Sequence, residues 1–151
     1  MWRRLTLDER IIALCGVALL LDSFAPWYWT DVGGPTVSRN AWHGPGLAFA
    51  LLAIALGVAL SALVVLRARA TGDGRTADPR RVALVHLVGG AAAFLLVILR
   101  MAAGRDEATW GLYLALVLSG GLFFGGLGLW KTAGRWWPTF PDGPRSREPS
   151  R

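Results

Sequence analysis

Four long apolar runs constrain the fold of this chain more than any other feature. The first covers residues 11–29 and is interrupted only by Asp22; the others, 44–66, 82–99 and 108–130, contain no Asp, Glu, Lys or Arg. A helix needs about 20 apolar residues to cross a hydrocarbon core roughly 30 Å thick, so each run is long enough. Every backbone amide in lipid must be paired, and the runs lack the alternation of barrel strands. The sequence therefore predicts an all-α fold, a four-helix transmembrane bundle over residues 1–130.

The composition agrees with a membrane protein. Of the 151 residues, 54% are hydrophobic, and the mean hydropathy is +0.43. A net charge of +6 would suggest nucleic acid in a soluble protein, but here the basic residues flank apolar runs. Anionic lipid is the natural counter-charge in that position. The expected partner is thus the lipid bilayer, with no role for nucleic acid.

The distribution of basic residues predicts the orientation. Thirteen of the 16 Lys and Arg residues lie in the N-terminal segment, in the connection between the second and third runs, and in the tail. The other two connections carry only Arg39, Arg100 and Arg105. Cytoplasmic loops are enriched in Lys and Arg, so we expect a multi-pass protein of the cell membrane with both termini in the cytoplasm.

The first run has the basic start of a signal peptide, but its end argues against cleavage. Ala25 is followed by Pro26 and Trp27, a poor cleavage context, so we expect a retained helix. A lipoprotein signal is also disfavoured, because the bulky Leu14 precedes Cys15. The lone Cys15 can form no internal disulfide and is interpreted as a packing residue.

The segments between the runs are polar and rich in Gly or Pro, without hydrophobic periodicity, and are expected to be connectors. The tail, residues 131–151, combines basic residues with Pro and Ser. We expect its aromatic start to lie on the membrane surface and its end to be disordered. Partner binding by this tail is the alternative to a solvated basic tail.

Small residues at a spacing of four mark the expected helix-packing faces. Gly121 and Gly125 lie one turn apart in the last run, and Gly57 and Ser61 have the same spacing in the second. Small residues allow helices to approach closely in a membrane. Packing within one chain is the first interpretation; the seam of a homo-oligomer is the second.

Three ionisable residues lie within or near the predicted membrane slab: Asp22, His86 and Arg100. A charged side chain in lipid costs a few kcal/mol, so it usually faces a partner inside the protein. At about 1.5 Å per residue, Asp22 and Arg100 both lie toward the outer side, whereas His86 lies near the cytoplasmic face. The candidate polar pair is therefore Asp22 with Arg100, and Ser23 and Tyr113 are further hydrogen-bonding candidates.

The sequence offers no catalytic or cofactor template. None of the serines lies in a nucleophile-elbow motif, and there is no paired-histidine or CxxC motif. His86, near Arg80 and Arg81, is interpreted as a hydrogen-bonded or head-group-facing histidine, and His43 has no second ligand close in sequence. We expect a protein that is not an enzyme and holds neither cofactor nor metal.

Three motifs resemble those of small four-helix membrane proteins that are frequent in actinobacteria. These are "FAPWYW" at the end of the first run, "NAWHG" before the second, and "WGLYLAL" with "SGGLFFGG" in the fourth. The resemblance covers nearly the whole chain and implies a four-helix membrane fold but no activity. Small multidrug-resistance transporters are a second comparison, since they also have four helices and an acid in the first, although theirs is a glutamate.

Two functional hypotheses follow. The first is a non-enzymatic structural or partner-binding membrane component. The second is a small oligomeric transporter coupled to protons or cations, with Asp22 as the coupling acid.

Overall fold

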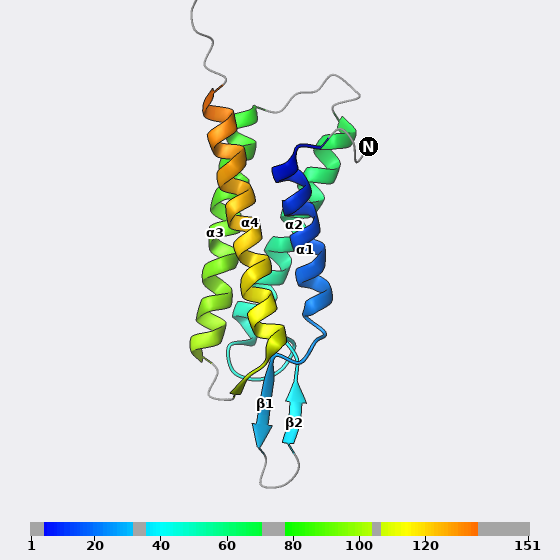
Figure 1. The fold of residues 1–151 in the computed structure, drawn as a ribbon, viewed down its shortest axis with the longest axis vertical. Coiled ribbons are helices and arrows are strands. Elements are labelled where there is room, and N and C mark those ends of the chain that lie inside the picture. The colour runs from blue at the N-terminus through cyan, green and yellow to red at the C-terminus, as the bar shows by residue number, and fades with distance from the viewer. Residues whose placement is uncertain (1–4, 32–35, 71–77, 104–106, 136–151) are drawn as a thin grey trace, which may run out of the picture.

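Four helices make up most of the computed structural model, which describes residues 5–31, 36–70, 78–103 and 107–135 (Figure 1). Their bounds are α1 Leu7–Asp22, α2 Leu47–Ala70, α3 Pro79–Ala103 and α4 Trp110–Arg135. Three of the described helices, α2, α3 and α4, are long and apolar enough to cross a membrane. The expected tail lies almost entirely outside the described residues. The described helices thus fit a membrane protein.

Helix α1 is shorter than the sequence predicts. It begins after Thr6, whose side chain accepts a bond from the Glu9 amide (3.3 Å) while the Glu9 carboxylate accepts from the Thr6 amide (2.9 Å). This capping box fixes the start of the helix. The helix ends at Asp22, with 16 residues, so the expected span over 11–29 is wrong at its outer end. The reason is Pro26, which cannot donate to a helix and disfavours helical backbone before it.

The expectation of a purely helical fold is also wrong in part, because a small sheet lies at one end of the helices (Figure 1). Its strands are β1 Tyr28–Asp31, β2 Thr36–Arg39 and β3 Glu107–Ala108, antiparallel in the order β2-β1-β3. The connections α1–α2 and α3–α4 both contribute strands to it, so they are not simple connectors. Aromatic and β-branched residues favour strands, and "YWT" and "TV" supply them.

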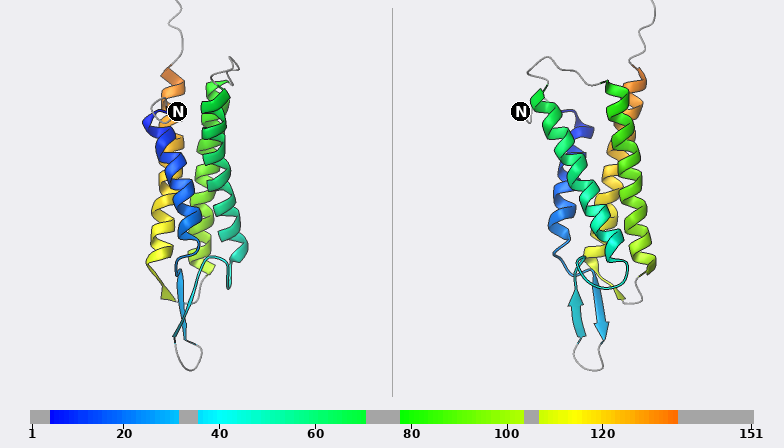
Figure 2. Two further views of the ribbon diagram at one scale, coloured as in Figure 1. Left: turned by 90° about the vertical axis from the view of Figure 1, so that its right-hand side faces the viewer. Right: turned by 180° about the vertical axis from the view of Figure 1, so that it is seen from behind.

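The four helices run antiparallel to one another in sequence order, each packing against the next, and α4 closes the arrangement against α1. The start of α1 and the end of α4 lie together at the end remote from the sheet (Figure 1). Toward that end α2 leans away from α3 (Figure 2). Each helix therefore runs between the same two ends of the molecule.

The surfaces of the helices are apolar on the outside as well as the inside. Large side chains such as Ile12, Leu19 and Leu122 are fully buried between helices. Others on all four helices are exposed: Leu14, Val17, Leu21, Leu52, Leu66, Val88, Leu95, Val117 and Phe124. Soluble proteins rarely expose such continuous apolar surface, and lipid would cover it.

Candidate functional site

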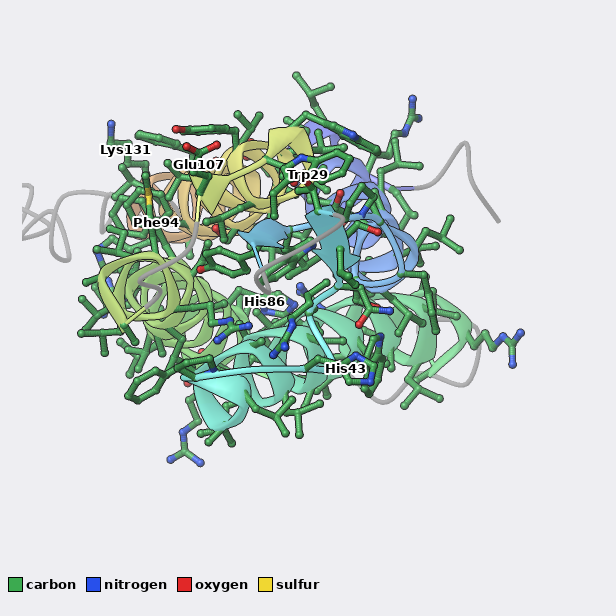
Figure 3. All side chains as sticks on the ribbon, turned by 90° about the horizontal axis from the view of Figure 1, so that it is seen from below. Trp29, His43, His86, Phe94, Glu107 and Lys131 are labelled. Carbon is green, nitrogen blue, oxygen red and sulfur yellow. The ribbon has the colours of Figure 1, made fainter. Side chains whose placement is uncertain are left out.

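Buried polar side chains gather at both ends of the helices. Near the sheet, Asp22, Ser23 and Arg100 are buried, and at the opposite end His86 is buried. Figure 3 looks along the molecule from the sheet and shows His86 in the middle of the helices. Buried polar groups need hydrogen-bond partners. The partners of each buried side chain therefore indicate whether it has a structural role or is available to a ligand.

The guanidinium of Arg100 organises the sheet end. Arg100 is only 1% exposed, and its Nη2 donates to the carbonyl of His43 at 2.7 Å. Its Cζ lies 4.8 Å from the centroid of the Tyr28 ring, a cation-π contact. Gly46, at φ 75°, also lies against Arg100, since a Cβ there would lie 3.2 Å from Arg100 Cδ and Nη1. The loop before α2 therefore packs around the side chain of Arg100.

Asp22 does not form the expected hydrogen bond with Arg100. Its side chain is 6% exposed, and neither carboxylate oxygen has a hydrogen-bond partner among the described residues. Its backbone carbonyl accepts hydrogen bonds from Trp27 Nε1 at 3.0 Å and from the Ala25 amide at 2.9 Å. The physical reason is that α1 ends at Asp22 while Arg100 is directed to the loop and to Tyr28. What Asp22 does in the membrane stays a prediction.

The two other candidates near this pair have separate roles. Ser23 Oγ donates to the carbonyl of Leu20 at 2.6 Å, one turn back in α1. Tyr113 is 52% exposed on the outer face of α4. Neither side chain therefore forms a hydrogen bond with the carboxylate of Asp22.

The predicted small packing residues all lie at contacts between helices of one chain. A Cβ on Gly121 would lie 2.5 Å from Cys15 Sγ, and one on Gly125 would lie 2.8 Å from Ile12 Cγ1. Helix α1 therefore packs directly against these glycines. Gly57 lies against Leu19, while Ser61 Oγ is 3.2 Å from the carbonyl of Ile12. The faces at which these residues lie are thus occupied within the chain.

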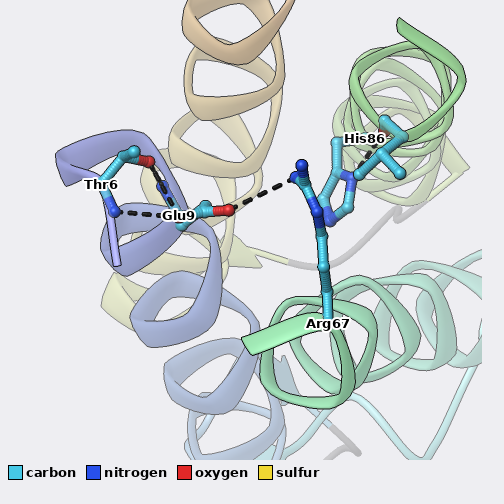
Figure 4. Close-up of polar contacts among 5 residues, drawn as sticks. Thr6, Glu9, Arg67 and His86 are labelled. Carbon is cyan, nitrogen blue, oxygen red and sulfur yellow. Dashed lines mark hydrogen bonds and ion pairs between the residues drawn. The ribbon is translucent and has the colours of Figure 1, made fainter. Parts of the chain in front are cut away.

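Sequence reasoning missed a polar cluster at the end remote from the sheet (Figure 4). Arg67 of α2 reaches toward α1, where its Nη1 lies 3.4 Å from Glu9 Oε1. His86 of α3 is 2% exposed; its Nδ1 lies 2.8 Å from the carbonyl of Val82, and its Nε2 is buried without a hydrogen-bond partner among the described residues. In the sequence, the capping-box signal "TLDE" and the position of His86 inside an apolar run are hints, but neither indicates that three helices meet here.

Two cavities lie beside this cluster and share Arg67. One, of about 340 Å³, lies between α2 and α3 and includes Arg81 and His86 in its lining. The other, of about 380 Å³, is lined by all four helices, with Glu9 and Thr132 among its residues. A cavity next to a buried, unpartnered nitrogen is the feature most indicative of a ligand in the described part of the chain.

Three further polar side chains have local hydrogen-bond partners. Ser61 Oγ and Ser119 Oγ donate to carbonyls of their own helices, and His43 Nδ1 lies 2.8 Å from Asn40 Oδ1 in the loop. Over the described ranges, no group of three or more His, Cys, Asp or Glu could hold a metal ion.

No protein family model, curated protein or solved structure matches this chain.

Proposed function

We propose that this chain is an integral protein of the cell membrane, a four-helix transmembrane bundle with both termini in the cytoplasm. Helices α2, α3 and α4 have the length and apolarity of spans. Helix α1 is shorter, about 24 Å, but it runs between the same two ends and exposes Leu14, Val17 and Leu21 as its neighbours expose their apolar residues. The excess of Arg at the end remote from the sheet supports the orientation.

Its role is that of a non-enzymatic structural or partner-binding component, and the observation that carries this is the folded sheet. Loops that only connect helices need no sheet, yet here β1 is bonded to both β2 and β3. Strand β2 is an edge strand in which Val37 is 47% exposed, and Trp29 of the neighbouring strand β1 is 45% exposed on the other face of the sheet. An open edge strand with apolar neighbours is a typical site for strand pairing by a partner. A second membrane protein or a second copy of this chain is the expected partner.

Cysteine labelling tests the membrane topology. Cys15 is the only cysteine, so Cys15→Ala supplies a background for Ser38→Cys in β2 and Ser146→Cys in the tail. A membrane-impermeant maleimide should label Ser38→Cys in intact cells and Ser146→Cys only after permeabilisation. Labelling of both from the same side would refute the topology.

Photo-crosslinking tests the partner-binding role. A photoreactive residue at Val37 should give one discrete protein adduct in native membranes, whereas the same residue at Leu84, which is exposed on α3, should react with lipid. If both positions give the same adducts, or neither reacts with protein, the sheet is not a docking surface.

A coupled transporter is the second candidate, and the buried carboxylate of Asp22 favours it. A buried carboxylate without a partner is most stable as the neutral acid, which is the property of a proton carrier. Proton- or cation-dependent flux in vesicles should then be abolished by Asp22→Asn while the protein remains folded. Undiminished flux, or flux absent from the wild type, would exclude Asp22 as a coupling acid.

A further inference from the structure

The cavity between α2 and α3 has aliphatic walls. Its volume is about 340 Å³, and five of the eight residues that line it are apolar: Leu63, Leu66, Ala70, Val82 and Val85. Leu66 and Val85 are 59% and 50% exposed, and α2 leans away from α3 at this end of the helices (Figure 2). The cavity therefore opens sideways between the two helices, where lipid would meet the protein. None of the five apolar side chains is aromatic, so the walls suit flexible acyl chains better than a flat ring.

The ring of His86 supplies a hydrogen-bond acceptor in these walls. His86 is 2% exposed, and its Nδ1 lies 2.8 Å from the carbonyl of Val82 in its own helix. A carbonyl can only accept, so Nδ1 carries the proton and, in the neutral ring, Nε2 is an acceptor. The ring reaches from α3 toward Arg67 of α2 (Figure 4), and Nε2 is buried without a hydrogen-bond partner among the described residues. An unsatisfied buried acceptor is costly, and a ligand hydroxyl that donates to Nε2 would remove that cost.

The two arginines in the lining already have acidic neighbours. Arg67 Nη1 lies 3.4 Å from Glu9 Oε1, and Arg81 Nε lies 3.7 Å from Asp78 Oδ2. Their charges are therefore offset by carboxylates of the protein. An ionised acid can only accept hydrogen bonds, so an anionic group placed beside His86 would leave Nε2 unsatisfied. Both observations favour a neutral ligand.

We propose that this cavity binds a neutral lipid with a free hydroxyl group, of the diacylglycerol type. The hydroxyl donates to His86 Nε2, and the first methylene groups of an acyl chain lie along Leu66 and Val85. A cavity of this size takes only the glycerol group and the start of the chains, so the rest of the lipid extends into the bilayer through the open side. This inference rests on the proposed membrane location of the helices.

A pair of lipids that differ only at the hydroxyl tests the contact with His86. The full chain in mild detergent is titrated with dioleoylglycerol or with its 3-acetyl ester, in which the hydroxyl is blocked, and native mass spectrometry measures the bound lipid. We expect dioleoylglycerol to bind about threefold to tenfold more tightly, as one hydrogen bond to a buried acceptor allows. Equal binding of the two lipids, or no binding of either, would overturn the proposal.

Substitutions separate the ring nitrogen from the shape of the cavity. His86→Phe keeps a ring without nitrogen, so it should lose the preference for the hydroxyl, whereas His43→Phe, the same change in the loop before α2, should keep it. If His86→Phe does not fold, Val85→Trp takes its place, because the indole should fill the cavity and weaken binding severalfold. Its control is Val88→Trp, which is exposed on the same helix outside the lining and should not weaken binding. Equal effects of the two members of either pair would contradict the site.

Charge dependence distinguishes a neutral ligand from an anionic one. Dioleoyl phosphatidylglycerol has the same acyl chains and an anionic head group, and it should not displace dioleoylglycerol at equal concentration. Arg81→Gln should leave the binding of dioleoylglycerol unchanged. Displacement by phosphatidylglycerol, or weaker binding in Arg81→Gln, would make the ligand an anionic lipid and overturn the proposal.

The labelling of Ser38→Cys and Ser146→Cys separates two kinds of failure. If the two positions label from opposite sides and the preference for the hydroxyl is absent, the lipid site is wrong and the membrane topology stands. If they label from the same side, the membrane location on which the lipid site rests is wrong.

Discussion

Tyr28 and Arg100 hold each other through two different contacts. The hydroxyl of Tyr28 donates to the backbone carbonyl of Arg100 at 2.9 Å, and the guanidinium of Arg100 lies over the Tyr28 ring. The first contact occupies a carbonyl near the end of α3 that the helix itself leaves unpaired. The second places a charge on an aromatic face in a site closed to water. Together they attach β1 to α3 through two residues that are 72 positions apart in sequence.

The two contacts predict that substitutions at Tyr28 and Arg100 lower the free energy of unfolding by different amounts. Tyr28→Phe keeps the ring and removes only the hydroxyl, so it should lower the free energy of unfolding by about 1 kcal/mol. Arg100→Met removes the ring contact and the bond to the His43 carbonyl, and should cost more, about 2–4 kcal/mol. Reversible unfolding in detergent measures both. Equal losses, or a silent Arg100→Met, would show that the guanidinium does not organise the loop.

The absence of a bond between Asp22 and Arg100 leads to a second prediction. A true ion pair would make Asp22→Asn and Arg100→Gln both destabilising and non-additive. Because neither carboxylate oxygen of Asp22 has a hydrogen-bond partner among the residues that the structure describes, Asp22→Asn should leave stability unchanged or raise it, while Arg100→Gln should lower it. Thermal denaturation of the two single variants and the double variant distinguishes these cases. Loss of stability in both single variants, with coupling in the double variant, would restore the pair.

The helices were predictable from the sequence because the length of an apolar run without charges indicates the length of the helix that could cross a membrane. Three of the four runs contain long apolar helices close to the expected positions. The C-terminal end of the first helix was not predictable, since the aromatic residues Trp27, Tyr28 and Trp29 continue the apolar run past Pro26. Hydropathy does not distinguish a helix from a strand that packs at the same depth.

The candidate site was harder to predict than the fold. Asp22 and Arg100 were singled out by their depth, but depth does not say in which direction a side chain points around the helix axis. The contact between Arg67 and Glu9 depends on how α1 and α2 cross, which the order of polar and apolar residues along the chain does not give. His86 was judged by its sequence neighbours Arg80 and Arg81, whereas its buried Nε2 is a property of three-dimensional packing.

The close contact of α3 with α4 predicts a position-specific effect of glycine substitution. A Cβ on Gly126 would lie 2.6 Å from the His86 carbonyl oxygen and 2.8 Å from Leu87 Cα, both backbone atoms that cannot move alone. Gly126→Ala should therefore cost about 1–3 kcal/mol. Gly120→Ala is the control on the same helix, because its Cβ would meet only the Phe94 ring, at 3.6 Å. It should be neutral or stabilising by helix propensity; similar losses at both positions would contradict the packing.

The contact of α1 with α4 predicts a compensating pair. A Cβ on Gly121 would lie 2.5 Å from Cys15 Sγ but 3.6 Å from Cys15 Cβ, so the sulfur atom is the obstacle. Gly121→Ala should lower stability by about 1–2 kcal/mol, and adding Cys15→Ala should recover most of that loss. Sedimentation in detergent should show the same oligomeric state for the wild type, Gly121→Ala and the double variant, because the contact lies within one chain. If Gly121→Ala instead changes the oligomeric state and Cys15→Ala does not compensate, Gly121 belongs to a seam between copies of the chain.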